Sequence, residues 1–257
     1  CKSLTSIYFP SSLRKLYNNI FAHTTQKKRI IIKNTIPPDI EISGIYFNLS
    51  PITSKCTLYV PKGTLDAYKK ATTWGRAGAF YEGNPIDSIT FPSNVSFAKT
   101  EKNKMTYSVL PIDANQECLK WSSDNSSIAS IDEKTGVVTA LKAGDATLTA
   151  TVDDGSGISA STIVHVTPIK VSNIDMLREI TLLQAQSVTL AATITPELAD
   201  DKTLSWASED ESIATVTQEG VVKGVNVGTT NITATAKDGS GVSATCKVTV
   251  NPVTINL

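Results

Sequence analysis

Apolar and polar residues alternate with a period of two along much of the chain. The clearest run lies within residues 146–166 and is interrupted by the turn sequence Asp-Gly-Ser-Gly. Its residues at every second position are Ala146, Leu148, Ala150 and Val152, then Ile158, Ala160, Thr162, Val164 and Val166. Because successive side chains of a strand point to opposite faces, this pattern predicts an antiparallel hairpin with one buried face.

The same pattern occurs twice. Trp121, in Leu-Lys-Trp-Ser-Ser, returns 85 residues later as Trp206, in Leu-Ser-Trp-Ala-Ser. After a one-residue deletion the spacing is 84, and the turn at Asp154 returns at Asp238. The second alternating run consists of Ile232, Ala234 and Ala236, then Val242, Ala244, Cys246, Val248 and Val250. A repeat of this length can hold its own core, so we expect two β-sandwich domains.

These copies resemble the group 2 bacterial Ig-like domain. That family has a Trp-Ser-Ser-like strand, then Ile-Ala, Gly-Val-Val, a glycine turn, Thr-Ala-Thr and a final Val-x-Val strand. Both copies carry nearly all of these elements, over roughly residues 86–252. The resemblance implies Ig-like sandwiches of the kind found in tandem on bacterial surface proteins, and it implies no catalysis.

Residues 1–84 have a different pattern. The chain begins Cys-Lys-Ser-Leu-Thr-Ser-Ile-Tyr-Phe-Pro-Ser-Ser-Leu, in which Leu4, Ile7 and Phe9 are expected to point inward. This segment resembles a BspA-like leucine-rich repeat, with Asn19-Ile20-Phe21 at the position of its second apolar anchor. Residues 22–55 depart from the repeat and show only one strand signal, Ile30-Ile31-Ile32.

The resemblance resumes at Cys56 in Thr-Leu-Tyr-Val-Pro-Lys-Gly-Thr-Leu-Asp-Ala-Tyr. Thr64 is expected to cap a short helix, on which Leu65, Tyr68 and Ala71 share one face. We expect this helix to close the open end of a solenoid that would otherwise expose its core.

Composition narrows the possible functions. The 257 residues include 24 basic and 24 acidic residues, a balance that does not favour binding to nucleic acid. No apolar run reaches the roughly 18 residues that a membrane span needs. The chain starts at Cys1 and shows no leader pattern, so we interpret it as a fragment.

Candidate chemistry is sparse. His23 and His165 lie in different segments, and His165 is expected on a solvated face. The acidic residues cluster where turns are expected, at 153–154, 200–201 and 209–211. The turn at Asp154 lacks the ligand spacing of a calcium loop. The sequence therefore singles out no catalytic, cofactor-binding or metal-binding residue, although it does not exclude a Ser-His-Asp site.

Aromatic and cysteine residues leave alternatives open. Trp121 and Trp206 are expected in the sandwich cores. A second group is assigned to core or interdomain packing, with a ligand-binding surface as the alternative: Tyr59, Tyr68, Trp74, Phe80 and Tyr81. The four cysteines are widely spaced and predict free thiols: Cys1, Cys56, Cys118 and Cys246. Cys1 could instead carry a lipid.

The sequence as a whole predicts a mainly β protein. We expect the end of a leucine-rich-repeat solenoid with a short capping helix at 1–84, followed by Ig-like β-sandwiches at 85–168 and 169–257. The expected function is non-catalytic adhesion at the cell surface or after secretion. The solenoid would bind a host protein or glycan, and the sandwiches, in a monomer, would form a semi-rigid stalk. The alternative is a carbohydrate-binding accessory protein, which a cluster of exposed aromatic side chains would favour.

Overall fold

The alternating residues form the predicted hairpins. In the computed structural model, which describes residues 5–17, 28–41 and 52–253, β14 (Gly144–Val152) pairs antiparallel with β15 (Ser159–Thr167). Every second residue of β14 is buried from Ala146 to Val152, as the sequence predicts. The second copy repeats this hairpin with β23 (Gly228–Ala236) and β24 (Ser243–Asn251).

Each copy builds the same three sheets. In the first, the strand orders are β11-β14-β15-β8, β12-β13-β9 and β10-β7. Its remaining strands are β7 (Ser88–Thr90), β8 (Val95–Ala98), β9 (Lys102–Lys104), β10 (Ser108–Leu110), β11 (Leu119–Ser123), β12 (Ala129–Ile131) and β13 (Val137–Ala140).

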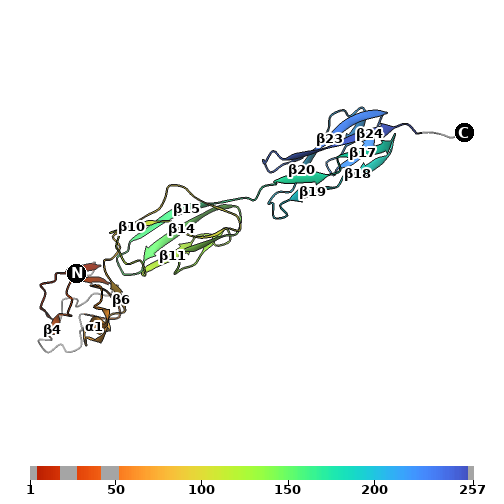
Figure 1. Ribbon diagram of the computed structural model, residues 1–257. Coiled ribbons are helices and arrows are strands. Elements are labelled where there is room, and N and C mark those ends of the chain that lie inside the picture. Colours follow the sequence, from red (N-terminus) through yellow and green to blue (C-terminus); the bar gives the residue numbers. More distant parts are fainter. Residues whose placement is uncertain (1–4, 18–27, 42–51, 254–257) are drawn as a thin grey trace. The chain divides into compact units, whose positions relative to one another are not determined.

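In the second copy the orders are β20-β23-β24-β17, β21-β22-β18 and β19-β16, so the topology is repeated strand for strand. The remaining strands are β16 (Asn173–Met176), β17 (Glu179–Leu183), β18 (Ser187–Thr189), β19 (Ala192–Thr195), β20 (Leu204–Ser208), β21 (Ala214–Val216) and β22 (Val221–Gly224). The predicted pair of β-sandwiches is therefore confirmed (Figure 1).

The two tryptophans occupy equivalent core positions, as predicted. Trp121 is 4% exposed and Trp206 is 8% exposed, and each belongs to the core of its own copy. In the first copy the rings of Phe91 and Tyr107 pack edge-on against Trp121, at centroid distances of 6.1 and 5.1 Å. In the second copy the positions equivalent to Phe91 and Tyr107, 85 residues later, are Met176 and Ala192, so neither aromatic ring is repeated.

The N-terminal segment folds around a small parallel sheet, drawn red to orange in Figure 1. Its strand order is β1-β3-β5-β6, which is also the order along the chain. The strands are β1 (Ser6–Phe9), β3 (Lys28–Ile32), β5 (Cys56–Val60) and β6 (Ala79–Glu82), and a second parallel pair is formed by β2 (Lys15–Tyr17) and β4 (Asp39–Glu41).

One face of this sheet, the inner face, packs on a core of its own. Phe9, Ile30, Ile32, Leu58 and Val60 are buried there, and Ile7 packs against them. The inward positions predicted for Ile7 and Phe9 are therefore confirmed. The described residues do not include four other features named from the sequence: Cys1, Leu4, the anchor Asn19-Ile20-Phe21 and His23.

A short helix follows β5 where the sequence places it. α1 (Leu65–Lys70) buries Tyr68 against the inner-face core, and a 3₁₀ turn (Trp74–Arg76) buries Trp74 beside it. Thr64 occupies the N-cap position, but the prediction that its side chain caps the helix is wrong. Its hydroxyl donates to the carbonyl of Pro61 at 2.7 Å and accepts no hydrogen bond from the N–H groups of the first helical turn.

The opposite face of the sheet, the outer face, packs against the first sandwich. Ile31 and Tyr59 point to this face and belong to the same hydrophobic core as Trp121 and Leu148. The chain accordingly separates into two compact units, Cys1–Val166 and Thr167–Leu257, with the sheet and the first copy in the same unit.

Candidate binding surfaces

The described histidine lies on the surface. His165 Nδ1 is 2.7 Å from Asp145 Oδ1 on the neighbouring strand, and both side chains are more than half exposed. Its predicted place on a solvated face is confirmed. Within residues 5–17, 28–41 and 52–253, no three His, Cys, Asp or Glu side chains gather in a way that could hold a metal ion.

The acidic clusters mostly shape turns, as the sequence indicates. The carboxylate of Asp201 accepts hydrogen bonds from the N–H and hydroxyl of Thr203, and that of Asp210 accepts the same pair from Ser212. These hydrogen bonds hold the pKa of both carboxyls below its usual value. Asp154 and Asp238 each accept the N–H of the serine two residues later.

Most of the aromatic group near α1 is buried. Tyr68 donates to the carbonyl of Asn34 at 2.9 Å, and Trp74 Nε1 donates to the carbonyl of Pro38 at 2.7 Å. Tyr59 is fully buried, and Phe80 and Tyr81 are partly buried against the two cores. Packing therefore accounts for these side chains, and their alternative role as an exposed ligand platform does not fit the structure.

The described cysteines are also interior. Cys56, Cys118 and Cys246 are buried, and none of these three is in a disulfide. Burial raises the pKa of the Cys118 and Cys246 thiols, which keeps them in the less reactive protonated form. The structure gives no indication of a reactive thiol at these positions.

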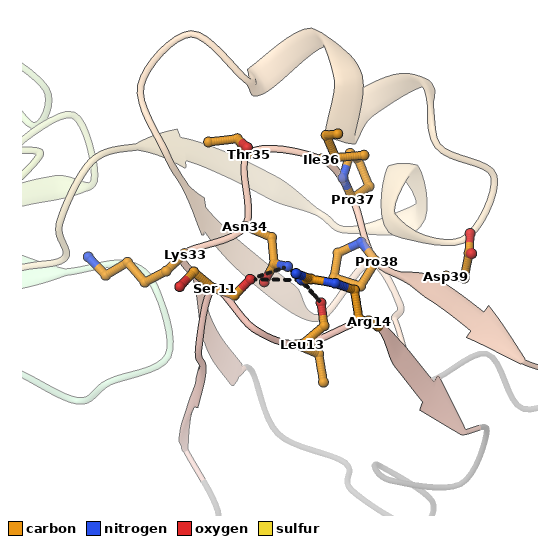
Figure 2. A pocket seen from close by; sticks show the side chains of 10 residues that line it. All are labelled: Ser11, Leu13, Arg14, Lys33, Asn34, Thr35, Ile36, Pro37, Pro38 and Asp39. Carbon is orange, nitrogen blue, oxygen red and sulfur yellow. Dashed lines mark hydrogen bonds between the residues drawn. The ribbon is translucent and has the colours of Figure 1, made fainter.

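A cavity lies on the loops that follow β1 and β3. It has a volume of about 530 Å³, within the range of small-molecule sites. Figure 2 shows its lining side chains, which come from residues 11–14 and 33–39: Ser11, Leu13, Arg14, Lys33, Asn34, Thr35, Ile36, Pro37, Pro38 and Asp39. The lining combines cations, one carboxylate, hydroxyls and apolar groups.

The side-chain amide of Asn34 and the backbone N–H of Asp39 hold the two cavity loops together, and Arg14 bonds within its own loop. The buried Asn34 donates from Nδ2 to the carbonyls of Ser11 at 3.0 Å and Leu13 at 2.7 Å. Arg14 Nη1 donates to the same two carbonyls, at 3.1 and 3.3 Å, as the dashed lines in Figure 2 show. The N–H of Asp39 donates to the carbonyl of Arg14 and links the loops a third time.

The exposed guanidinium is the group best able to bind a ligand. Arg14 uses only Nη1 within the described part of the chain, so Nε and Nη2 can still donate. Ile36, which is 77% exposed, and the exposed carboxylate of Asp39 also line the cavity. Such a surface can hold a small polar or acidic group against an apolar edge.

Sequence reasoning did not identify this cavity. Arg14 and Asn34 lie 20 residues apart in segments without a chemical motif, and the parallel pairing of β1 with β3 and of β2 with β4 brings their loops together. The one available signal was positional, because both residues follow short apolar strand segments and parallel strands end at the same edge.

Comparison with known proteins identifies the two copies. The family model for the bacterial Ig-like domain (group 2) matches residues 85–163 and again 165–248. An uncharacterised protein of Clostridium acetobutylicum is 32% identical over 152 residues, which are 58% of this chain and 15% of that protein. An α-L-arabinofuranosidase of Bifidobacterium longum subsp. longum is 40% identical over 99 residues, 38% of this chain and 9% of the enzyme.

Among solved structures, domains 1–6 of the surface layer protein SbsC match 68% of this chain and 30% of that one, at 14% identity and a TM-score of 0.33. The chain thus spans only a small part of the first curated relatives. None of the described helices is long and apolar enough to cross a membrane. Two matches to one family model cover more than half of the residues, and the chain belongs to the group 2 bacterial Ig-like domain family.

Proposed function

We propose that this chain is a non-catalytic part of a bacterial adhesion or interaction protein at the cell surface or secreted from the cell. Residues 1–84 form the recognition module, as the C-terminal end of a leucine-rich-repeat solenoid. The Ig-like copies, at 85–168 and 169–257, form the stalk. The ligand is a host protein or a glycan.

The guanidinium in the cavity at Arg14 is the observation that supports this division of labour most strongly, because the cavities of about 450 and 580 Å³ on the first and second copies have no arginine in their lining. Within the described residues, Nε and Nη2 of Arg14 make no hydrogen bond, and the cavity lies on the loops of the N-terminal sheet. The two Ig-like copies, by contrast, repeat one topology, and the connections between equivalent strands match in length to within two residues. Binding sites are usually built on loops that vary, so matched loops favour a spacer.

The order of the parallel strands supports the solenoid. Each strand of the N-terminal sheet pairs with the next parallel strand along the chain, and β2 and β4 form a second parallel ladder. A coil that advances by one strand per turn gives this arrangement. α1 occupies the third connection, where burial of Tyr68 covers the inner-face core, which fits the expected closing role of the helix.

A carbohydrate-binding accessory protein is the second candidate. In its favour, one similar region belongs to an arabinofuranosidase, and Tyr8 on β1 is 59% exposed. Sugars often stack on exposed aromatic rings. However, all three tryptophans are buried, so the cluster of exposed aromatic side chains that would favour this candidate is missing from the described residues.

A binding screen tests the proposal. The full chain would be immobilised and probed against a glycan array and a panel of extracellular-matrix proteins, with turnover of the same glycans followed in parallel. We expect saturable binding to at least one probe without turnover. Turnover that survives repurification, or no binding to any probe, would contradict the proposed function.

A further inference from the structure

The outer face of the parallel sheet is largely covered by the first Ig-like copy. Tyr8, Ile31, Tyr59 and Tyr81 pair in register across the four strands and form one row on this face. Exposure falls along the row from 59% at Tyr8 to 9% at Ile31 and zero at Tyr59. The sandwich therefore covers the middle of the sheet and leaves the β1 edge open.

A buried polar cluster lies inside this contact. Asp154, in the turn between β14 and β15, is fully buried and accepts the Tyr59 hydroxyl on Oδ2 at 2.9 Å. Arg29 Nη1 lies 3.8 Å from the same oxygen and donates to the carbonyl of Ile86 at 2.7 Å. The thiol sulfur of Cys118 is 3.2 Å from the Tyr59 hydroxyl.

These partners come from different modules. Arg29 and Tyr59 belong to the sheet, whereas Asp154, Cys118 and Ile86 belong to the first copy. A buried carboxylate is costly unless hydrogen bonds and an opposite charge replace its lost hydration. Here the Tyr59 hydroxyl and the Arg29 guanidinium of the sheet replace it, so burial of Asp154 depends on groups from both modules. At the margin the contact continues through Asn84, whose Oδ1 accepts the Lys33 ammonium at 2.7 Å and whose Nδ2 donates to Asp113 Oδ2 of the first copy at 2.9 Å.

The second copy provides an internal comparison. Asp238 occupies the same turn, and its Oδ1 accepts the N–H of Ser240 as Asp154 Oδ1 accepts that of Ser156. Its other oxygen, however, accepts the backbone N–H of Val171, at the start of its own copy. The Oδ2 atom of Asp154 thus contacts the N-terminal sheet, whereas the Oδ2 atom of Asp238 contacts the start of its own copy.

We propose that the Asp154 turn of the first Ig-like copy is a docking surface for the N-terminal sheet, and that the sheet and this copy unfold as one cooperative unit. The partner that this surface fits is a parallel sheet face carrying a tyrosine hydroxyl and a guanidinium. A ligand of the N-terminal module must then bind at the loop edge or the β1 edge, because the middle of the outer face is occupied. The docking is independent of the proposed adhesive role.

Hydrogen exchange followed by mass spectrometry at increasing urea concentration tests this docking in the full chain. Peptides from β5, β14 and β23 report on the sheet, the first copy and the second copy. In the wild type we expect β5 and β14 to lose protection at the same urea concentration. Asp154→Asn should lower both midpoints by equal amounts and leave β23 unchanged.

Asp238→Asn is the matched control and should lower the β23 midpoint alone. Tyr59→Phe removes one hydroxyl from the sheet and keeps the Asp154 turn intact, so it remains informative if Asp154→Asn does not fold. It should lower the β14 midpoint by the same amount as the β5 midpoint. Loss of β5 protection before β14 in the wild type, or a Tyr59→Phe effect confined to β5, would overturn the proposal.

Discussion

Two glycines determine how closely a turn approaches each core tryptophan. Gly136 has φ +68°, and a Cβ there would lie 2.8 Å from Trp121 Cε2. Gly220 has φ +79°, and a Cβ would lie 3.0 Å from Trp206 Cζ2. Both contacts are tighter than ordinary van der Waals contact, so the Gly-Val-Val element of the repeat is explained by packing against the indole ring as well as by backbone conformation.

Gly136→Ala should therefore destabilise the first copy more than Gly157→Ala. Both glycines have positive φ, but nothing lies within 4 Å of a Cβ at Gly157. Left-handed backbone costs each variant roughly 1–2 kcal/mol, and overpacking against Trp121 adds about 1–3 kcal/mol to Gly136→Ala alone. Equal losses of free energy of unfolding in urea would show that the contact with the ring costs nothing.

Truncation of a core tryptophan tests the independence of the copies. Trp206→Ala should cost about 3–5 kcal/mol, because the buried indole leaves a cavity that the sandwich cannot fill. The loss should be visible in the exchange protection of β23 and absent from β14. An unchanged unfolding curve for β23 would mean that Trp206 is not a core residue.

At the scale of elements, aspartate side chains stabilise turns in both copies by accepting hydrogen bonds. Asp132 and Asp210 each accept an N–H and a hydroxyl from residues two or three positions later. For Asp210 the donors are both from Ser212, and these hydrogen bonds lower the pKa of its carboxyl. The turn is thus held better by the charged carboxylate than by the protonated acid.

Asp210→Asn should accordingly remove part of the acid sensitivity of the second copy. A lowered pKa in the folded state stabilises the fold at pH values above the usual aspartate pKa of about 3.9, and this stabilisation is lost as the pH falls through the folded pKa. The urea midpoint of the variant should lie below that of the wild type at pH 7 and approach it at low pH. Glu211→Gln, an exposed neighbouring change, is the control; a pH-independent difference for Asp210→Asn would contradict this explanation.

The elements differ in how far the sequence predicts them. Alternation and the internal repeat predict the hairpins and Trp positions, since burial of every second residue leaves a direct trace in sequence. The N-terminal sheet is harder to predict from the sequence, because β3 and β5 are buried on both faces and their residues show no alternation of apolar and polar side chains. Thr64 shows the limit of cap signals, because a hydroxyl near a helix start can also bond a preceding carbonyl, here that of Pro61.

For the whole molecule, the sequence predicts the modules and misses how two of them join. Tyr59 and Asp154 are 95 positions apart, and the turn at Asp154 reads the same as the turn at Asp238. Nothing in the shared turn sequence Asp-Gly-Ser-Gly indicates that Asp154 contacts the N-terminal sheet, whereas Asp238 contacts the first residues of its own copy. The cavity at Arg14 was missed for the same reason, since it depends on the pairing of strands that are distant along the chain.

The central claim is that recognition belongs to the loop edge of the N-terminal sheet, and the affinity of two arginine variants tests it most directly. The full chain with Arg14→Ala and with Arg178→Ala, an exposed arginine of the second copy, would be compared by surface plasmon resonance against a probe bound in the screen. Loss of a hydrogen bond from a charged donor should weaken binding by about tenfold or more for Arg14→Ala, with Arg178→Ala unchanged. Unchanged affinity in Arg14→Ala, or an equal loss in both variants, would contradict the account.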